Sequence, residues 1–430
     1  MMLSLRVRQP RQPASAHGRV IRTLATGIAV GLAVSMSGCS AAGSATSGMS
    51  GKTVKMFTWV GNSDESAQWT AYINGGKLAD PSLSVNFSGP AIGSYYTKLP
   101  TQLQGTDAPC IVTLQNGQLA PYVNALEPLD AYMKEKGVNV GDYDPSMIKQ
   151  LSSGGHVYAL PYDAEPMVVY YNKKLFAAAG VKAPALDWTT ADFLAAAKKT
   201  TRNGVYGFAI GQGIGAVGNF LAANNENYVS NDGKADLSNA ALETRFQWLI
   251  DLARVYKVSQ PLEASGGTFP DIDEFGSGQA AMFINGTWDL VHEQGMIGAH
   301  NLGVAVVPSD NGQPHGSIAG TGYAMTKSCS DKKAAFAAIA AMTSSKSEQS
   351  VAKSRSQVPS RADSLGAWQS SVGPEAAAVV KVLTANGQVG ATATNGNEIN
   401  TLFTQYEVDG FSGKSTAAEV LKDVSAGLGQ

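Results

Sequence analysis

The sequence predicts an α/β protein built from two lobes, and three observations support this prediction. From residue 53 onward, short runs of β-branched and aromatic residues alternate with helical segments, which is typical of parallel sheets covered by helices. The chain has 430 residues, enough for two domains with sizeable cores. The predicted strands end in polar or aromatic residues, and ligands of open α/β sheets bind beyond such strand ends.

The folded part begins with a β-α-β unit. A run of β-branched and aromatic residues over 53–60 predicts a strand, with Trp59 near its end. Residues 65–78 form a predicted helix, and the alternating residues 83–87 form a second strand. Because strand, helix and strand follow one another, we expect the two strands to lie parallel.

The same alternation continues toward the middle of the chain. A helix over 95–103 precedes a strand over 110–114, which leads into the polar corner Gln115-Asn116-Gly117-Gln118. An amide at such a corner has little packing reason to be there, so Asn116 is a candidate ligand contact. The apolar run 167–171 predicts a further strand with polar residues on its N-terminal side.

Helices are predicted for most of the remaining chain. Thr189 or Thr190 followed by an acidic first turn is typical of a helix start, and Gly180 is typical of a helix end. The predicted helices cover 173–179, the segment after Thr190, 240–256, 332–343 and most of 375–429.

The first 38 residues are predicted to be a secretory signal. They contain arginines but no acidic residue, and their apolar stretch over 24–34 is too short to span a bilayer. The stretch ends at Met36-Ser37-Gly38-Cys39, which is similar to the lipobox of bacterial lipoproteins. This resemblance implies that Cys39 is lipidated and anchors the chain to the outer face of the membrane. An ordinary secretory signal with an incidental cysteine is the alternative.

The charge composition argues against a nucleic-acid partner. The chain has 32 Lys plus Arg against 34 Asp plus Glu, and removal of the predicted signal takes away five arginines and no acidic residue. A mildly acidic protein without long basic runs is poorly suited to bind polyanions, so we expect no nucleic acid among its partners.

The cysteines and histidines predict no metal centre. Besides Cys39, the chain has only Cys110 and Cys329. We interpret Cys110, which lies in an apolar run, as a buried free thiol; a disulfide with Cys329 is the alternative in an oxidising compartment. The histidines show no His-Glu-x-x-His pattern, so no zinc site is expected.

A glycine cluster at 211–215 follows a predicted strand over 205–210. It has only a weak similarity to a dinucleotide-binding loop, because no acidic residue follows at the distance that such loops require. We therefore expect a flexible loop near a ligand cleft, and no cofactor.

Four segments in order resemble one protein family. They are Leu160-Pro161-Tyr162-Asp163-Ala164-Glu165 with Tyr170-Tyr171-Asn172, the segment 275–288 that ends in Asn285-Gly286-Thr287-Trp288, Gly320-Thr321-Gly322-Tyr323, and Pro359-Ser360-Arg361. Together they resemble the bacterial extracellular solute-binding proteins of family 1, the sugar receptors of ABC importers.

The resemblance implies both the fold and the mode of action. It implies a type II periplasmic-binding-protein fold, in which hinge crossovers join two lobes that close around a ligand in the cleft between them. It further implies a monomer without catalytic activity, a carbohydrate ligand and the permease subunits of an ABC transporter as partners. We expect a signal at 1–38, a lipidated tether at 39–52, an N-terminal lobe from 53–115 and 309–359, and a C-terminal lobe from 116–308 and 360–430.

The candidate ligand contacts combine aromatic rings with polar side chains. A pyranose stacks on aromatic rings, and its hydroxyls need partners because a buried unpaired polar group costs about 1 to 3 kcal/mol. By the resemblance, Glu165 is the cleft glutamate and Trp288 the stacking tryptophan, whereas Met167 stands where the family's best-known member has an aromatic ring. The expected contacts are Trp59, Asn116, Asp163, Glu165, Asn285, Trp288, Gly322, Tyr323 and Arg361.

Other roles remain open for several of these residues. The aromatic ones could pack in a core, and Arg361 could pair with a carboxylate near the hinge. Asp163 and Glu165 could be solvated loop residues, or the acid and base of an extracellular glycan hydrolase or lyase. A receptor for a non-sugar solute is a further alternative, although a phosphate ligand would favour more arginines than the site offers.

Overall fold

The computed structural model describes residues 53–105, 107–230, 233–263, 270–389 and 393–429. The predicted signal, the tether and Cys39 lie outside these residues. Within the described ranges, no helix combines the length and the apolar character needed to cross a membrane.

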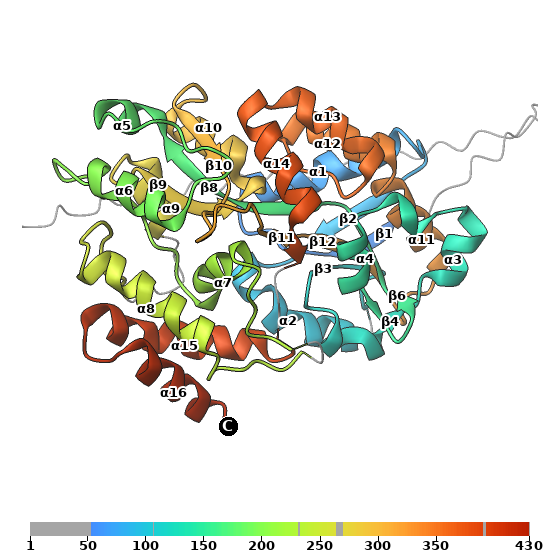
Figure 1. Cartoon of the computed structure of the whole chain (residues 1–430). Helices are drawn as coiled ribbons and strands as arrows, with labels where there is room; N and C mark the ends of the chain where they lie inside the picture. The colour runs from blue at the N-terminus through green and yellow to red at the C-terminus, as the bar shows by residue number, and fades with distance from the viewer. Residues whose placement is uncertain (1–52, 106, 231–232, 264–269, 390–392, 430) are drawn as a thin grey trace, which may run out of the picture. The chain divides into compact units, whose positions relative to one another are not determined.

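The first sheet has six strands and collects segments from distant parts of the chain (Figure 1). Its strands are β1 (Val54–Phe57), β2 (Val85–Ser88), β3 (Ile111–Gln115), β4 (Leu126–Glu127), β7 (Ala159–Pro161) and β12 (Thr321–Thr326). The order is β2-β1-β3-β12-β4, with β7 also paired to β12. β1 is parallel to β2 and β3, as the β-α-β pattern predicts, whereas β12 runs antiparallel to its neighbours.

The second sheet is built around one long central strand. Its strands are β8 (Glu165–Asn172), β9 (Met282–Gly286), β10 (Leu302–Ala305), β11 (Ser317–Ala319) and β13 (Gln388–Val389). β8 is antiparallel to β9, β10 and β11, so the prediction of parallel pairing is wrong for these three pairs, whereas β11 and β13 are parallel. Several helices separate β8 from β9, and a simple strand-helix-strand crossover does not apply there.

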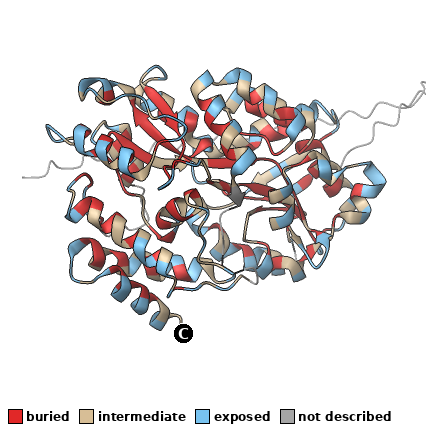
Figure 2. Cartoon of the chain, in the orientation of Figure 1, coloured by how far each residue is buried: buried red, intermediate tan, exposed pale blue. Residues whose placement is uncertain are grey.

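The helices of the first lobe pack with the first sheet around one apolar core (Figures 1 and 2). Trp69, Tyr95, Leu99, Ile111 and Ile339 are fully buried in this core. β5 (Ser152–Ser153) and β6 (His156–Val157) form a short antiparallel hairpin just before β7 in the sequence. The helices are α1 (Ser63–Lys77), α2 (Ile92–Gln104), α3 (Asp130–Lys136), α4 (Pro145–Gln150), α11 (Lys332–Met342) and α12 (Ser345–Arg355).

The second lobe has its own core, which is rich in phenylalanine. Phe193, Phe208, Phe246 and Phe403 are buried in it together with Trp368. Its helices are α5 (Lys173–Ala178), α6 (Thr190–Thr200), α7 (Ile214–Ala223), α8 (Ala240–Arg254), α9 (Pro270–Gly276), α10 (Leu290–Ile297), α13 (Leu365–Ser371), α14 (Pro374–Asn386), α15 (Gly396–Ser412) and α16 (Ala417–Gly427).

Local capping explains where several of these helices begin. The Thr189 side chain accepts from the backbone of Asp192, whose carboxylate in turn accepts from the Thr189 backbone, and this reciprocal pair starts α6. Asn172 caps α5 in a similar way, and Gly180 follows the end of that helix with a φ of +65°. The sequence signals for this helix pair are therefore confirmed.

The boundary between the lobes differs from the one expected at residue 116. Apolar side chains from Leu119 to Ala164 are buried in the first core, and β4 and β7 belong to the first sheet. The first lobe therefore continues to Ala164, because strand pairing with the distant β12 holds this segment there.

Two other expectations are corrected by the structure. Cys110 is not a free thiol: it forms a disulfide with Cys329, because the pairing of β3 with β12 brings the two cysteines together. The predicted strand at 205–210 is an extended segment with only isolated bridges, Arg202–Val205 and Tyr206–Ala280.

Among the described residues, three segments cross between the lobes. The first crossing, 161–165, leads from β7 to β8, and the second crossing, 319–321, leads from β11 to β12. The third crossing, 356–361, follows α12: Val351 of that helix lies in the first core, whereas Val358 lies in the second.

Candidate functional site

A cavity of about 370 Å³ lies where the polar corner after β3 meets the second lobe. This volume is within the range of small-molecule sites. The second lobe supplies most of the wall, from α7 and the loop before it, from residues 226–228, and from strands β8, β9 and β11. Asn116 lines it from the first lobe. The cavity is therefore lined mainly by the second lobe, with Asn116 as a contact from the first.

Small residues of α7 keep one wall of the cavity open. Gly215, Gly218 and Asn219 of this helix line the cavity. A Cβ atom added to Gly215 or Gly218 would have no atom within 4 Å, so each glycine leaves space that a larger side chain would occupy. A ligand can consequently approach the backbone of α7 closely.

The glycine cluster before α7 also reaches the cavity, and helix α15 holds it in place. Gly213 N donates to both carboxylate oxygens of Glu407 at 3.1 Å, and Ile214 N donates to Asn400 Oδ1 at 3.2 Å. Gly213 has a φ of +84°, and an added Cβ would collide with the Asn400 side chain. Glycine is therefore required for this turn.

Asn116 presents a polar group from the first lobe. Its backbone N donates to Gly320 O at 2.8 Å, and Gly320 N donates to its Oδ1 at 3.0 Å. These bonds fix the side chain and leave Nδ2 without a partner among the described residues. Asn116 can therefore donate to a ligand oxygen.

Asp271 supplies a buried carboxylate at the start of α9. It is 8% exposed and lines the cavity. Burial raises its pKa to about 6, although backbone hydrogen bonds to the carboxylate oppose this rise. Near neutral pH the group is therefore ionised and can accept hydrogen bonds from hydroxyl groups.

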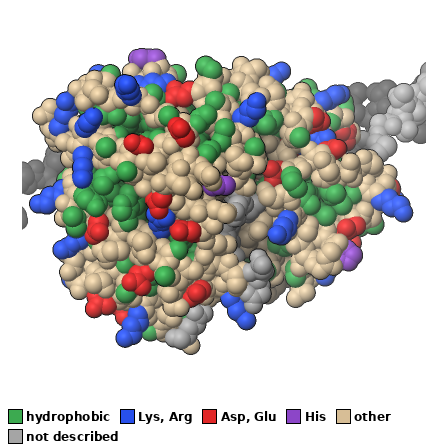
Figure 3. Space-filling view, in the orientation of Figure 1, with side chains coloured by type: hydrophobic (Ala, Val, Ile, Leu, Met, Phe, Trp, Pro, Cys, Tyr) green, Lys and Arg blue, Asp and Glu red, His purple; other side chains and the backbone are tan. Residues whose placement is uncertain are grey.

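The remaining lining is uncharged apart from one further carboxylate. Glu226 is the second acid, and Gln212, Asn219, Asn227 and Ser317 contribute amide and hydroxyl groups. Within the part of the chain that the structure describes, no lysine, arginine or histidine lines the cavity. On the face of the molecule shown in Figure 3, basic and acidic side chains are interspersed without an extended basic patch.

Apolar side chains complete the cavity. Phe208 and Phe220, with ring centroids 6.4 Å apart, line it together with Met167 and Ile284. Tyr228 adds a partly buried ring, and burial raises the pKa of its hydroxyl to about 12, so it stays a neutral donor. The cavity thus offers both apolar surface and hydrogen-bonding groups.

A pair of amide side chains links the two lobes near the cavity. Gln118, two residues after Asn116, donates from Nε2 to Asn397 Oδ1 at 3.4 Å. Asn397, in the first turn of α15, donates in return to Gln118 Oε1 at 3.3 Å. This reciprocal pair is exposed, and it joins the polar corner of the first lobe to α15 of the second lobe.

Among the residues expected to contact a ligand, Asn116 lines the cavity and the others lie elsewhere. Trp59 packs on Trp69 with centroids 5.1 Å apart, and Tyr323 packs on Tyr162 at 4.6 Å, both in the first core. Gly322 is buried, and it is packed so tightly that an added Cβ would lie 2.6 Å from Leu151.

Asp163 and Glu165 lie in the first crossing and are buried. Asp163 accepts a hydrogen bond from Thr321 N, and Glu165 accepts from Val358 N and from the Thr287 hydroxyl. The solvated loop interpretation is therefore wrong for both residues. Their carboxyl groups are occupied by partners inside the protein.

Asn285 lies near the end of β9, and Trp288 lies in the turn that follows this strand. Asn285 Nδ2 donates to Asp289 Oδ2 at 2.9 Å, and its Oδ1 accepts from Gly286 N. Trp288 is 40% exposed and covers Gly286, where an added Cβ would collide with its ring. Trp288 is therefore not a core residue.

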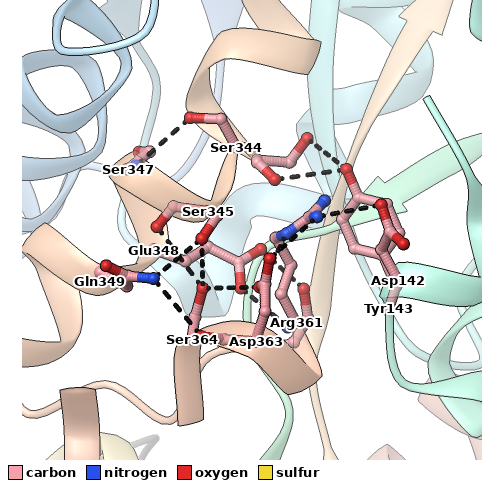
Figure 4. Close-up of polar contacts among 12 residues, drawn as sticks. Asp142, Tyr143, Ser344, Ser345, Ser347, Glu348, Gln349, Arg361, Asp363 and Ser364 are labelled. Atoms are coloured by element: carbon pink, nitrogen blue, oxygen red, sulfur yellow. Dashed lines mark hydrogen bonds and ion pairs between the residues drawn. The ribbon is translucent and has the colours of Figure 1, made fainter. Parts of the chain in front are cut away.

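Arg361 forms ion pairs at the third crossing, as the alternative interpretation predicted (Figure 4). Its guanidinium lies 3.0 Å from Asp142 and 3.2 Å from Asp363, and it stacks over Tyr143 at 4.8 Å. Glu348 nearby accepts from Ser360 Oγ and from Arg361 N, both at 2.8 Å.

Sequence reasoning missed most of the cavity residues. Asp271 follows a proline at a helix start, and Asn219 lies within an apolar helix, so neither carried a local signal of its own. The available signal was the glycine cluster, since Gly211, Gln212 and Gly215 line the cavity.

Comparison with known proteins identifies the family to which this chain belongs. A model of the bacterial extracellular solute-binding proteins matches residues 61–349. The chain belongs to this family. Its members act outside the cytoplasm, as the family description states.

Curated relatives match only part of the chain. A mannitol-binding protein of Pseudomonas aeruginosa is 25% identical over 167 residues, 37% of each chain. A putative binding protein of Brucella abortus is 30% identical over 134 residues, which is 30% of this chain and 32% of the relative. The chain thus spans about a third of the length of these relatives.

Solved structures share the fold over nearly the whole described chain. An ABC substrate-binding protein of Listeria monocytogenes in complex with cycloalternan has a TM-score of 0.77 at 22% identity, covering 87% of this chain and 97% of that one. The GacH receptor of Streptomyces glaucescens has a TM-score of 0.74 at 21% identity, covering 87% and 97%. Maltose-bound MalE3 of T. maritima has a TM-score of 0.72 at 20% identity, covering 88% and 99%. The two-lobed solute-binding fold is therefore confirmed.

Proposed function

We propose that this protein captures a neutral carbohydrate or polyol in the cavity between its lobes and delivers it to the permease of an ABC importer. The observation that carries this proposal is the chemistry of the cavity: amides, carboxylates and apolar rings, with no cationic side chain among the described residues. Carboxylates and amides match sugar hydroxyls. Glu226 is already paired with Arg245 at 3.2 Å, so an anionic solute would meet the unpaired carboxylate of Asp271 and no cationic side chain among the described lining residues.

The names of the relatives point in the same direction. One curated relative is a mannitol-binding protein, and the structures with the same fold include complexes with cycloalternan and maltose. The ligand-contacting set that we propose is Asn116, Gln212, Asn219, Asp271 and Tyr228, all of which line the cavity.

Isothermal titration calorimetry with a solute panel tests the proposal. The panel contains mannitol, maltose and a mannotriose as neutral solutes, and glucose 6-phosphate and glucuronate as anionic ones. We expect heat of binding from at least one neutral solute and none from the anionic ones. Binding of the anionic solutes alone would reject the proposal.

Single substitutions test the site. Asn116→Ala and Asp271→Ala should each weaken binding by about 1.5 kcal/mol or more, roughly tenfold, because each removes a hydrogen-bonding group from a buried site. Asp423→Ala, on an exposed face of α16, is the matched control and should bind like the unaltered protein. Equal affinities of all three variants would place the ligand elsewhere.

The membrane anchor and the lack of turnover are further parts of the proposal. The Met36-Ser37-Gly38-Cys39 segment supports lipidation of Cys39 after removal of residues 1–38. Mass spectrometry of the N-terminal peptide should detect the acyl chains, and Cys39→Ser should release a monomeric protein into the medium. Incubation with oligosaccharides should leave them uncleaved, because the carboxyl groups of Asp163 and Glu165 are buried and hydrogen-bonded within the protein.

A further inference from the structure

Asp163 and Glu165 connect the first crossing to the other two. Asp163 Oδ1 accepts from Thr321 N of the second crossing at 2.6 Å. Glu165 Oε1 accepts from Val358 N of the third crossing at 2.9 Å. The two carboxyl groups therefore fasten all three crossings to one another.

Backbone hydrogen bonds run alongside these side-chain bonds. Tyr162 N donates to Thr321 O at 3.0 Å, and Ala164 N donates to Val358 O at 3.1 Å. Glu165 Oε2 also accepts from the hydroxyl of Thr287, directly after β9, which ties the first crossing to the second lobe. The crossings thus form one bonded layer rather than three separate linkers.

The second crossing is bonded in turn to the cavity wall. Gly320 precedes Thr321, the residue that Asp163 holds, and it exchanges two hydrogen bonds with Asn116. An added Cβ at Gly320 would press on Met147 and on the carbonyl of Asp163, so these segments are tightly packed. A continuous path of bonds runs from Asp163 through the second crossing to Asn116.

Both carboxyl groups are enclosed by protein. Asp163 is 5% exposed and Glu165 is 1% exposed, and neither lines the cavity. Burial raises the pKa of Asp163 to about 8 and raises the pKa of Glu165 well above its ordinary value, and the neighbouring Asp163 adds to the latter effect. A neutral carboxylic acid and an amide are both planar, uncharged and similar in size. Asn in place of Asp163 and Gln in place of Glu165 should therefore keep the hydrogen bonds that the carboxyl oxygens accept.

We propose that Asp163 and Glu165 are positioning residues of the hinge, whose hydrogen bonds to the other crossings set the angle between the lobes. Through Gly320, this angle also determines where Asn116 lies relative to the cavity wall of the second lobe. The two residues act through the backbone and not by touching a ligand. This role is independent of which solute the protein binds.

Small-angle X-ray scattering of the full chain without ligand tests the proposal. We expect Asp163→Ala and Glu165→Ala to change the radius of gyration relative to the unaltered protein, and Asp163→Asn and Glu165→Gln to restore it. The matched control is Glu407→Ala, which removes a buried, hydrogen-bonded carboxylate whose partner, Gly213, belongs to the same lobe. The control should lower stability and leave the radius of gyration unchanged.

Hydrogen exchange gives a second readout at the bonds themselves. The Thr321 amide should exchange about tenfold faster in Asp163→Ala, and the Val358 amide in Glu165→Ala, since each loses a hydrogen bond. If either alanine variant does not fold, Thr287→Val removes one partner of Glu165 at nearly constant volume and should also shift the radius of gyration. Folded variants with the radius of gyration of the unaltered protein would overturn the proposal, because a direct ligand contact or a purely stabilising role predicts that result.

Discussion

The disulfide between Cys110 and Cys329 closes a very long loop, and its removal has a calculable cost. Cys110 precedes β3, Cys329 follows β12, and 219 positions separate them in the sequence. The loop-closure model of the unfolded chain assigns such a bridge about 5 kcal/mol at room temperature. Measured values fall at or below this model, so we expect loss of the bridge to lower the free energy of unfolding by about 3 to 5 kcal/mol.

Urea titration of three variants measures this effect. Cys110→Ala, Cys329→Ala and the double variant are unfolded in parallel with the oxidised protein, with circular dichroism and tryptophan fluorescence as probes. Because either single substitution already opens the loop, the double variant should lose little more than each single one. The protein treated with a reductant should match the variants.

Two outcomes would refute the reasoning. A loss below about 1 kcal/mol would mean that the unfolded chain gains little freedom when the loop opens. Losses that add in the double variant would mean that each side chain stabilises the fold by its own packing, since Cys329 is buried and Cys110 half-buried.

Three further predictions follow from the bonds around the cavity. Burial raises the pKa of Glu407 from 4.5 to about 8. Between these two pH values the folded protein therefore holds a proton that the unfolded chain releases. The free energy of unfolding should consequently fall, by at most about 5 kcal/mol, as the pH rises from about 5 to 8. Glu407→Gln should flatten this dependence in thermal melts, whereas the exposed Glu398→Gln should not. Gly213→Ala should lower stability by about 1 to 2 kcal/mol in urea titration, because its φ is +84°; an unchanged midpoint would contradict this. Gln118→Ala or Asn397→Ala should speed ligand release about two- to fivefold in stopped-flow measurements, and the double variant should release no faster if the two amides act as a pair.

Much of the first lobe could be predicted because its signals are local. The strand at 53–60 and the helix at 65–78 are found as β1 and α1 within a few residues, since alternation and helical periodicity depend only on neighbours in the chain. The insertion of β12 beside β3 could not be predicted, because it joins segments about two hundred residues apart.

The candidate site was predicted only where a polar residue interrupts a local pattern. Asn116 follows a buried strand, and the glycine cluster precedes α7, and both reach the cavity. Asp163 and Glu165 carried an equally polar signal, yet they serve the crossings, because the bonding partners Thr321 and Val358 come from far along the chain.

The amino-acid sequence by itself therefore determined the two-lobed α/β class and the family, through four ordered motifs, and the positions of β1, β2, β3, β8 and several helices, through short-range patterns. The tertiary structure alone decided which polar residues line the cavity and which bond the crossings to one another. It also decided that Cys110 meets Cys329. Burial and bonding partners arise only when strands distant in sequence pair in one sheet, and no local pattern carries that information.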